Sequence, residues 1–158
     1  MTNNYTFKTP IGFIKICEEN NKLTALSLQQ GEAETALSSK FAQHSELLYE
    51  AYRQINEYFA GKRKKFELPI SNMGTAFQKQ VWEELQKIPY GETRSYEDIA
   101  VAIGNPKAVR AVGQANSRNQ LLIIVPCHRV IHKNGDITGF ACGTEAKKYL
   151  LDLEKGYI

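Results

Sequence analysis

The early part of the chain alternates between apolar and polar positions, whereas most of the remainder is patterned at helical intervals. Three short alternating runs separated by turn sequences predict an antiparallel meander over residues 5–8, 12–17 and 23–28. From Glu46 to Ala60 the apolar residues recur three or four positions apart, which predicts a helix. We therefore expect an α+β lobe over residues 1–74, in which no residues are grouped for chemistry.

A second region, residues 75–158, carries helical signals from its start. Thr75 is a candidate N-cap for a helix that Pro89 ends, and Ser95 is a candidate N-cap for a second, shorter helix. Pro106 suits the first turn of a third helix, running from about Lys107 to Ala115. Two short helices joined by a tight turn are typical of a helix-turn-helix, which favours DNA as a partner.

The apolar run Leu121–Val125 predicts a buried strand, and Pro126 ends it because proline has no N–H for sheet pairing. Cys127 then lies at the mouth of the core, followed by His128 and Arg129. Positive neighbours favour the thiolate, which is the reactive form of cysteine. A merely buried, inert cysteine is the alternative.

The last predicted helix runs from Thr144 to about Lys155. Ala146, Leu150 and Glu154 are spaced by four and share one face, so Glu154 is expected to point inward. A buried carboxylate needs a partner, and His128 is the natural candidate. Cysteine, histidine and glutamate form a relay that also occurs in hydrolases, so the residue types alone do not fix the reaction. A solvated Glu154 close to the end of the chain is the other interpretation.

Charge is distributed unevenly, although the net charge is only +3. Between Ile99 and Gly135 there is no acidic residue, while five cations fall in that window: Lys107, Arg110, Arg118, Arg129 and Lys133. The third helix combines small residues with Arg110, the one long cation at its centre, which suits close approach to a narrow DNA groove. Tight packing of that helix in the core would explain the small residues equally well.

The composition of the chain limits its domain number and argues against a membrane helix, a disulfide framework and a metal site. With 158 residues, 42% of them hydrophobic, the chain can form one domain or two small lobes, and no apolar run is long enough for a membrane helix. The three cysteines lack Cys-x-x-Cys spacing, so we expect free thiols and a cytoplasmic location. Cys17 and His44 are too few for a zinc site, and we expect neither a metal nor a cofactor.

Several motifs in order resemble those of the O6-alkylguanine-DNA alkyltransferases, also called methylated-DNA-protein-cysteine methyltransferases. The resemblance extends from Phe77 to Glu154, and its motifs are Tyr90-Gly91-Glu92-Thr93-x-Ser95-Tyr96, the segment 104–113, Asn119 and Pro126-Cys127-His128-Arg129-Val130. It implies a ribonuclease H-like N-terminal lobe and a mainly helical C-terminal domain with a winged-helix-like helix-turn-helix. It further implies a monomer that binds double-stranded DNA in the minor groove, flips an O6-alkylguanine into a pocket and takes up the alkyl group once, irreversibly; O4-alkylthymine is a second possible lesion.

The same resemblance assigns roles to individual residues. Cys127 would be the alkyl acceptor, His128 would take its proton through a water, and Glu154 would hold the imidazole. Tyr96 would donate a hydrogen bond to the purine, and Asn119 would support the active-site turn.

Arg110 would fill the gap left by the flipped base. The other residues expected to contact DNA are Thr93, Ser95, Lys107, Ala108, Gly113, Gln114, Arg118 and Arg129, and those expected to line the substrate pocket are Val130, Phe140, Ala141, Cys142 and Gly143. Phe140 and Ala141 replace a tyrosine and a serine or arginine that many family members carry, so the lesion oxygen would depend on backbone amides. Two alternatives stay open: a lesion-binding sensor that does not transfer the alkyl group, and a helix-turn-helix regulator with a structural cysteine.

Overall fold

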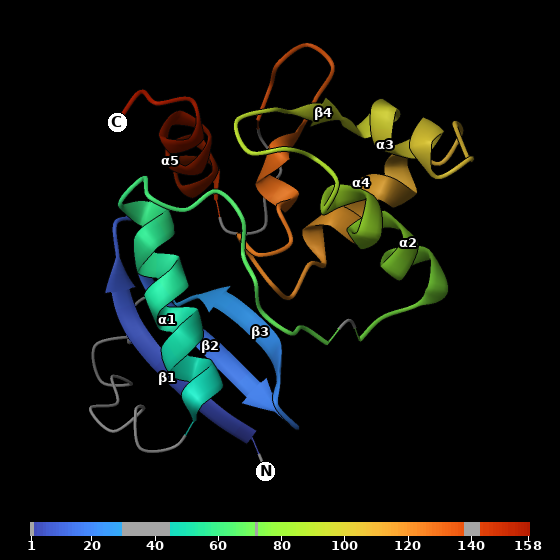
Figure 1. Ribbon diagram of the computed structural model, residues 1–158. Helices are drawn as coiled ribbons and strands as arrows, with labels where there is room; N and C mark the ends of the chain where they lie inside the picture. Colours follow the sequence, from blue (N-terminus) through green and yellow to red (C-terminus); the bar gives the residue numbers. More distant parts are fainter. Residues whose placement is uncertain (1, 30–44, 72, 138–142) are drawn as a thin grey trace. The chain divides into compact units, whose positions relative to one another are not determined.

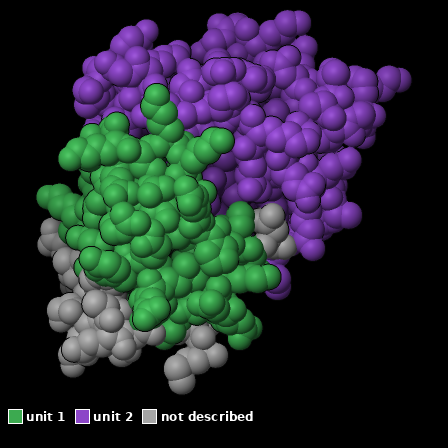
Figure 2. All heavy atoms as spheres, in the orientation of Figure 1, with its two compact units in different colours: residues 1–72 green, residues 73–158 purple. Residues whose placement is uncertain are grey.

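The computed structural model describes residues 2–29, 45–71, 73–137 and 143–158. The chain divides into two compact units, residues 1–72 and 73–158, drawn in green and purple in Figure 2. Throughout the described ranges, every helix is too short or too polar to cross a bilayer.

The first unit contains a three-stranded antiparallel sheet and one helix, as the sequence predicts. The strands β1 (Thr2–Thr9), β2 (Gly12–Glu19) and β3 (Lys22–Leu28) are neighbours in chain order, and α1 (Glu46–Phe59) follows them. The helix packs across the sheet in Figure 1, and the buried side chains of both form the core: Phe7, Ile14, Ile16, Leu23, Leu26, Leu48, Ala51, Ile55 and Tyr58. This α+β arrangement confirms the predicted fold class of the lobe.

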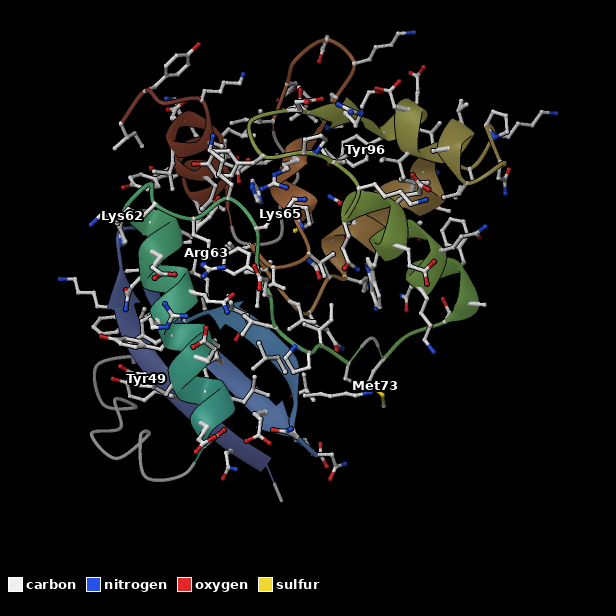
Figure 3. The ribbon with its side chains drawn as sticks, in the orientation of Figure 1. Tyr49, Lys62, Arg63, Lys65, Met73 and Tyr96 are labelled. Carbon is white, nitrogen blue, oxygen red and sulfur yellow. The ribbon has the colours of Figure 1, made fainter. Side chains whose placement is uncertain are left out.

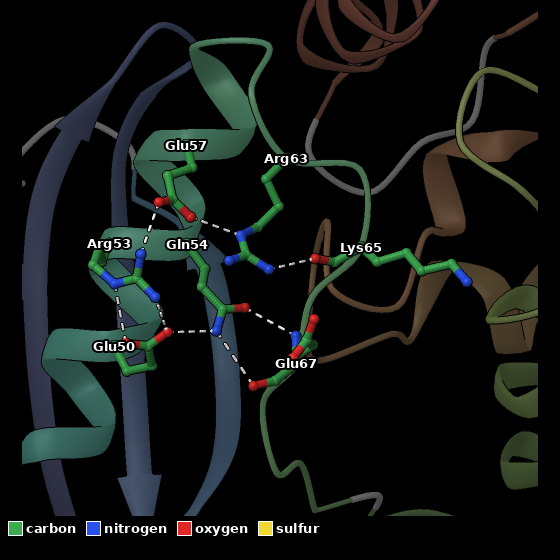
Figure 4. A network of polar contacts seen from close by, with 7 residues as sticks. All are labelled: Glu50, Arg53, Gln54, Glu57, Arg63, Lys65 and Glu67. Carbon is green, nitrogen blue, oxygen red and sulfur yellow. Dashed lines mark hydrogen bonds and ion pairs between the residues drawn. The ribbon is translucent and has the colours of Figure 1, made fainter.

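The segment that follows α1 contains the basic residues 62–65. Hydrogen bonds and an ion pair join this segment and Glu67 to the helix, as Figure 4 shows. Arg63 Nε donates to Glu57 at 2.8 Å, and its Nη1 donates to the carbonyl of Lys65 at 2.8 Å. The Gln54 side chain accepts from the backbone N–H of Glu67 at 2.9 Å. Figure 3 labels Lys62, Arg63 and Lys65 on this segment. The positive charge of Arg63 is thus paired with a carboxylate of the same unit.

The second unit is mainly helical, which also agrees with the predicted fold class. Its helices are α2 (Ala76–Leu85), α3 (Tyr96–Ala102), α4 (Val109–Ser117) and α5 (Thr144–Glu154). Thr75 and Ser95 cap α2 and α3, and each accepts from the backbone of its third helical residue in a full capping box, so these two helix starts are where local sequence rules place them.

A short parallel pairing brings two distant segments of this unit together. β4 (Arg94–Ser95) pairs with β5 (Val130–Ile131), with Arg94 opposite Val130 and Ser95 opposite Ile131. Tyr96 follows β4 directly, and the segment containing Cys127 precedes β5 directly. The pairing therefore fixes the start of α3, where Figure 3 labels Tyr96, beside the chain that leads out of the cysteine segment.

The third predicted helix begins later than expected. Pro106 lies in a hydrogen-bonded turn, closed by Ala108 N–H donating to the Asn105 carbonyl at 3.0 Å, and α4 starts only at Val109. The connection between α3 and α4 covers residues 103–108 and is longer than the expected tight turn, because the turn at Asn105 closes before the helix begins.

The prediction of a strand at Leu121–Val125 is wrong. The segment forms tight turns, in which Val125 N–H donates to the Leu121 carbonyl at 2.9 Å and Ile123 has a φ of 71°. Asn119 replaces a sheet partner here: its side chain accepts from Leu121 N–H at 3.0 Å and donates to the Val125 carbonyl at 2.7 Å. A continuous apolar run predicts burial, which is observed, but it does not determine the backbone conformation.

Candidate active site

Cys127 begins a single 3-10 turn, Cys127–Arg129, and is 2% exposed. It forms no disulfide. Its N–H donates to the Val125 carbonyl at 2.8 Å, and its carbonyl accepts from the buried Asn116 side chain at 3.3 Å. Asn116 thus bonds the turn itself, and Asn119 bonds the segment that precedes it. Asn119 was expected here from the sequence, but Asn116 was not, because the predicted helix ended at Ala115 and α4 continues to Ser117 with Asn116 on its buried face.

His128 and Glu154 form a buried pair. His128 Nε2 lies 2.6 Å from Glu154 Oε2, and the two side chains are 0% and 1% exposed. The other ring nitrogen, His128 Nδ1, is buried without a hydrogen-bond partner among the residues that the structure describes. Helical spacing alone placed Glu154 inward, and the structure brings it onto the expected imidazole.

The electrostatics of this pair favour a neutral imidazole beside an ionised carboxylate. Burial lowers the pKa of His128, and the charges of Arg129 and Lys147 lower it further, against the opposing effect of Glu154. Burial alone would raise the pKa of Glu154, but its hydrogen bonds and charge interactions with His128 and Arg129 hold it well below the usual range. A neutral ring that donates from Nε2 to the carboxylate has its lone pair on Nδ1, which is the state of a base.

The prediction that Arg129 contacts DNA is wrong. The residue is 7% exposed, and its guanidinium spans both oxygens of Glu154, with Nε to Oε1 at 2.8 Å and Nη2 to Oε2 at 3.0 Å. Nη1 donates to the carbonyl of Ile88 at 2.8 Å. The carboxylate supplies the countercharge that a buried guanidinium needs, so this cation is directed inward rather than to phosphate.

The turn before β4 completes the surroundings of Glu154. Gly91 N–H donates to Glu154 Oε1 at 3.2 Å, and Tyr90 lies under the Arg129 guanidinium, 5.8 Å from ring centroid to Cζ. Gly91 has a φ of 82°, and a Cβ at this position would lie 3.2 Å from the Glu154 carbonyl oxygen, so the turn requires glycine.

Tyr96 is buried at the start of α3, between several groups of the site. Its ring lies 5.0 Å from the ring of His132, and a Cβ at Gly113 would stand 3.8 Å from two of its carbons. Burial raises the pKa of Tyr96, as does the nearby Cys127, while Asn116 opposes the shift. The hydroxyl therefore stays protonated at neutral pH and is a hydrogen-bond donor.

Lys147 is a buried cation that the sequence analysis missed. It is 0% exposed, and its Nζ donates to the Val130 carbonyl at 2.6 Å and lies 6.0 Å above the Tyr96 ring. Burial lowers the pKa of Lys147 to about 8, against opposing effects of Cys127 and Asp136. Val130, which was expected to line the substrate pocket, is buried, and its carbonyl accepts the hydrogen bond from Lys147.

A cavity of about 570 Å³ opens beside α4 and is lined by Tyr96, Arg110, Gly113, Gln114, His132 and Lys133, among others. His132, for which the sequence predicts no role, forms part of this wall. Of the other residues expected at DNA, Lys107 and Arg118 are exposed, and Thr93, Ser95 and Ala108 are half-buried. Gly143 precedes α5 with a φ of 95°, and Phe140, Ala141 and Cys142 lie outside the described residues.

Among the residues that the structure describes, no three His, Cys, Asp or Glu side chains are close enough together to bind a metal ion.

Two family models match the chain, one for each unit. The ribonuclease-like domain of 6-O-methylguanine DNA methyltransferase matches residues 4–72, and its DNA binding domain matches residues 76–156. The constitutive methylated-DNA–protein-cysteine methyltransferase of Bacillus subtilis is 53% identical over 154 residues, covering 95% of this chain and 93% of the relative. The corresponding protein of Methanosarcina acetivorans is 47% identical over 148 residues, covering 94% and 95%.

Solved structures agree with these matches. The O6-methylguanine methyltransferase of Mycobacterium tuberculosis superposes with a TM-score of 0.86 at 40% identity, covering 100% of this chain and 95% of that one. A structure of Mycobacterium tuberculosis OGT in complex with DNA superposes with a TM-score of 0.87 at 42% identity, covering 97% and 92%.

Proposed function

Because this chain belongs to the 6-O-methylguanine DNA methyltransferase family and so repairs DNA by alkyl transfer, we propose that Cys127 is the residue that accepts the alkyl group. The observation that carries this assignment is the neighbouring His128–Glu154 pair at 2.6 Å, with Nδ1 of the imidazole left as an acceptor. Of the two cysteines in the described ranges, the other, Cys17, lies on β2 of the first unit.

The transfer is a displacement at a saturated carbon. His128 takes the Cys127 proton at Nδ1 through a bridging water, and Glu154 stabilises the resulting imidazolium. The sulfur then bonds to the alkyl carbon as the carbon–O6 bond breaks. The proton lost by the thiol balances the proton that the released guanine gains, so no cofactor or external reagent is required. The thioether is stable, and each molecule therefore acts once.

Tyr96 assists the leaving purine. Its hydroxyl is protonated at neutral pH because burial and Cys127 raise its pKa, and it donates a hydrogen bond to the base as negative charge develops there. A displacement at carbon forms no tetrahedral oxyanion, so the site needs donors on the base rather than an oxyanion hole.

Residues 75–158, which make up nearly all of the second unit, bind duplex DNA through the minor groove. Gly113 and the other small residues of α4 permit close approach, and the exposed Arg110 fills the space vacated when the alkylated guanine rotates out of the stack toward Tyr96 and Cys127. Lys107 and Arg118 are exposed cations suited to phosphate, and Gln114 lines the cavity. The protein acts as a monomer, in the reducing cytoplasm that keeps Cys127 a thiol.

A duplex in which one O6-methylguanine blocks cleavage by a restriction enzyme tests this function from the DNA side. Increasing protein should restore cleavage in proportion, one duplex per molecule, and Cys127→Ser should restore none. Repair beyond one duplex per molecule would refute the stoichiometric mechanism. Binding without repair by the wild-type protein would instead identify a damage sensor.

A further inference from the structure

Arg129 is the buried cation whose expected DNA contact the structure excludes, and the transfer described above gives it no part. Its guanidinium engages both oxygens of Glu154 at 2.8 and 3.0 Å and is anchored by the Ile88 carbonyl at 2.8 Å. A planar guanidinium bound through two nitrogens fixes a carboxylate in orientation as well as position.

The position of the carboxylate decides which nitrogen of His128 carries the proton. Glu154 Oε2, which Arg129 Nη2 contacts, is also the atom 2.6 Å from His128 Nε2. An ionised carboxylate only accepts hydrogen bonds, so the ring must donate its proton from Nε2, and Nδ1 keeps its lone pair. A carboxylate that rotated away or became protonated would remove this preference.

We propose that Arg129 is a positioning residue for alkyl transfer, which holds Glu154 as an oriented carboxylate so that His128 presents Nδ1 as the acceptor for the Cys127 proton. This inference rests on the proposed function of Cys127. Arg129 touches neither thiol nor lesion in this account and acts through Glu154.

The same contact also opposes protonation of the ring. The cationic guanidinium lowers the pKa of His128, together with burial and Lys147, and Arg129 helps to keep the pKa of Glu154 low. The titratable and charged groups around the pair are Cys127 and Arg129 on its own turn, Tyr90 on the preceding turn, Tyr96 on α3 and Lys147 on α5. Without Arg129, His128 should hold a proton to higher pH and fail as a base where the wild type still reacts.

The test compares single-turnover transfer from an O6-methylguanine duplex for wild type, Arg129→Met and Arg129→Lys across a pH range. Arg129→Met has a similar length without charge or donors, and we expect transfer about 10- to 100-fold slower, the range found when an outer-shell partner of a metal-bound histidine is lost. The acid limb of its pH profile should move to higher pH. Arg129→Lys keeps the charge but not the two-nitrogen geometry and should fall between the two. Arg53→Met, which removes an ion-paired arginine from α1, is the matched control and should react like wild type.

A spectroscopic readout separates positioning from a structural effect, and its measurement on the wild-type protein does not depend on whether a variant folds. Nitrogen-15 spectra of the histidine rings of the wild-type protein should show His128 as the Nε2–H form at neutral pH, and Arg129→Met should shift this population. The proposal is overturned if wild-type His128 carries its proton on Nδ1, or if a folded Arg129→Met keeps the wild-type pH profile and ring state, whatever its rate. Wild-type protein that fails to transfer at all would refute the function of Cys127 instead, which keeps the two failures distinct.

Discussion

Trp82 Nε1 donates to the Ala115 carbonyl at 2.9 Å, and both residues are buried. The bond joins α2 to α4 at the residue before Asn116, whose side chain donates to the carbonyl of Cys127. It therefore connects the first helix of this unit to the element proposed to enter the DNA groove.

Replacing Trp82 by Phe should destabilise the second unit by roughly 0.5–1.5 kcal/mol, because the Ala115 carbonyl loses this donor but keeps its hydrogen bond from Arg118 N–H at 3.2 Å. Trp82 is the single tryptophan of the chain, so urea unfolding must be followed by circular dichroism rather than by fluorescence. Tyr157→Phe, at a site 75% exposed, is the control and should unfold like wild type. Equal midpoints for Trp82→Phe and Tyr157→Phe would mean that the bond is dispensable.

Asn119 should be required for the conformation of the cysteine turn. In Asn119→Ala the Leu121 N–H loses its acceptor, and the Val125 carbonyl keeps only its hydrogen bond from Cys127 N–H, so we expect a loss of roughly 1–3 kcal/mol in unfolding free energy and slower transfer. Asn119→Asp retains the acceptor for Leu121 and loses the donor to Val125, so it should be less impaired than Asn119→Ala. Denaturant unfolding and single-turnover transfer measure both effects. If Ala and Asp at this position behave alike and match wild type, the segment holds its shape without the side chain.

Lys147 should make stability depend on pH in the alkaline range. Its pKa is lowered from 10.5 to about 8 in the folded state, so between these values the unfolded chain holds a proton that the folded protein has lost. The free energy of unfolding should therefore rise with pH over this window, by roughly 3 kcal/mol at most, relative to Lys147→Met. The measurement is urea unfolding of both proteins at several pH values. Parallel curves for the two proteins would show that Lys147 is not perturbed by burial.

Arg110→Ala should slow repair of duplex DNA by about tenfold or more, while duplex affinity changes much less, because rotating a base out of the stack costs a few kcal/mol that Arg110 helps to offset. Lys107→Ala is the comparison. Loss of one phosphate contact should weaken binding to all sequences, and the slope of the logarithm of the binding constant against the logarithm of salt concentration should fall by about one. Transfer rates and binding isotherms at several salt concentrations distinguish the two. Arg110→Ala that binds and repairs like wild type would remove Arg110 from base flipping.

Local rules in the sequence accounted for much of the site. Thr75 and Ser95 were identifiable as N-caps because capping depends on residues within one helical turn. Glu154 was identifiable as inward-facing because spacing by four from Ala146 and Leu150 fixes a helix face. Lys147 lies on the neighbouring stripe with Leu150, Leu151 and Glu154, so the same periodicity contained a signal for its burial that its charge obscured.

Other features depended on partners that no local pattern contains. The turns at Leu121–Val125 exist because Asn119 supplies their hydrogen bonds, and an apolar run cannot show this. Arg129 was assigned to DNA on its charge, but its direction is set by Glu154 and the Ile88 carbonyl, which are 25 and 41 residues away in the sequence.

The most direct test of the account is intact-protein mass spectrometry with peptide mapping, after wild-type protein is mixed with an excess of duplex that carries one O6-methylguanine. We expect the gain of a single methyl group per molecule, located on Cys127 and absent from Cys17, Cys142 and the Cys127→Ser variant. A methyl group on another residue, or an unmodified protein beside a repaired duplex, would contradict it.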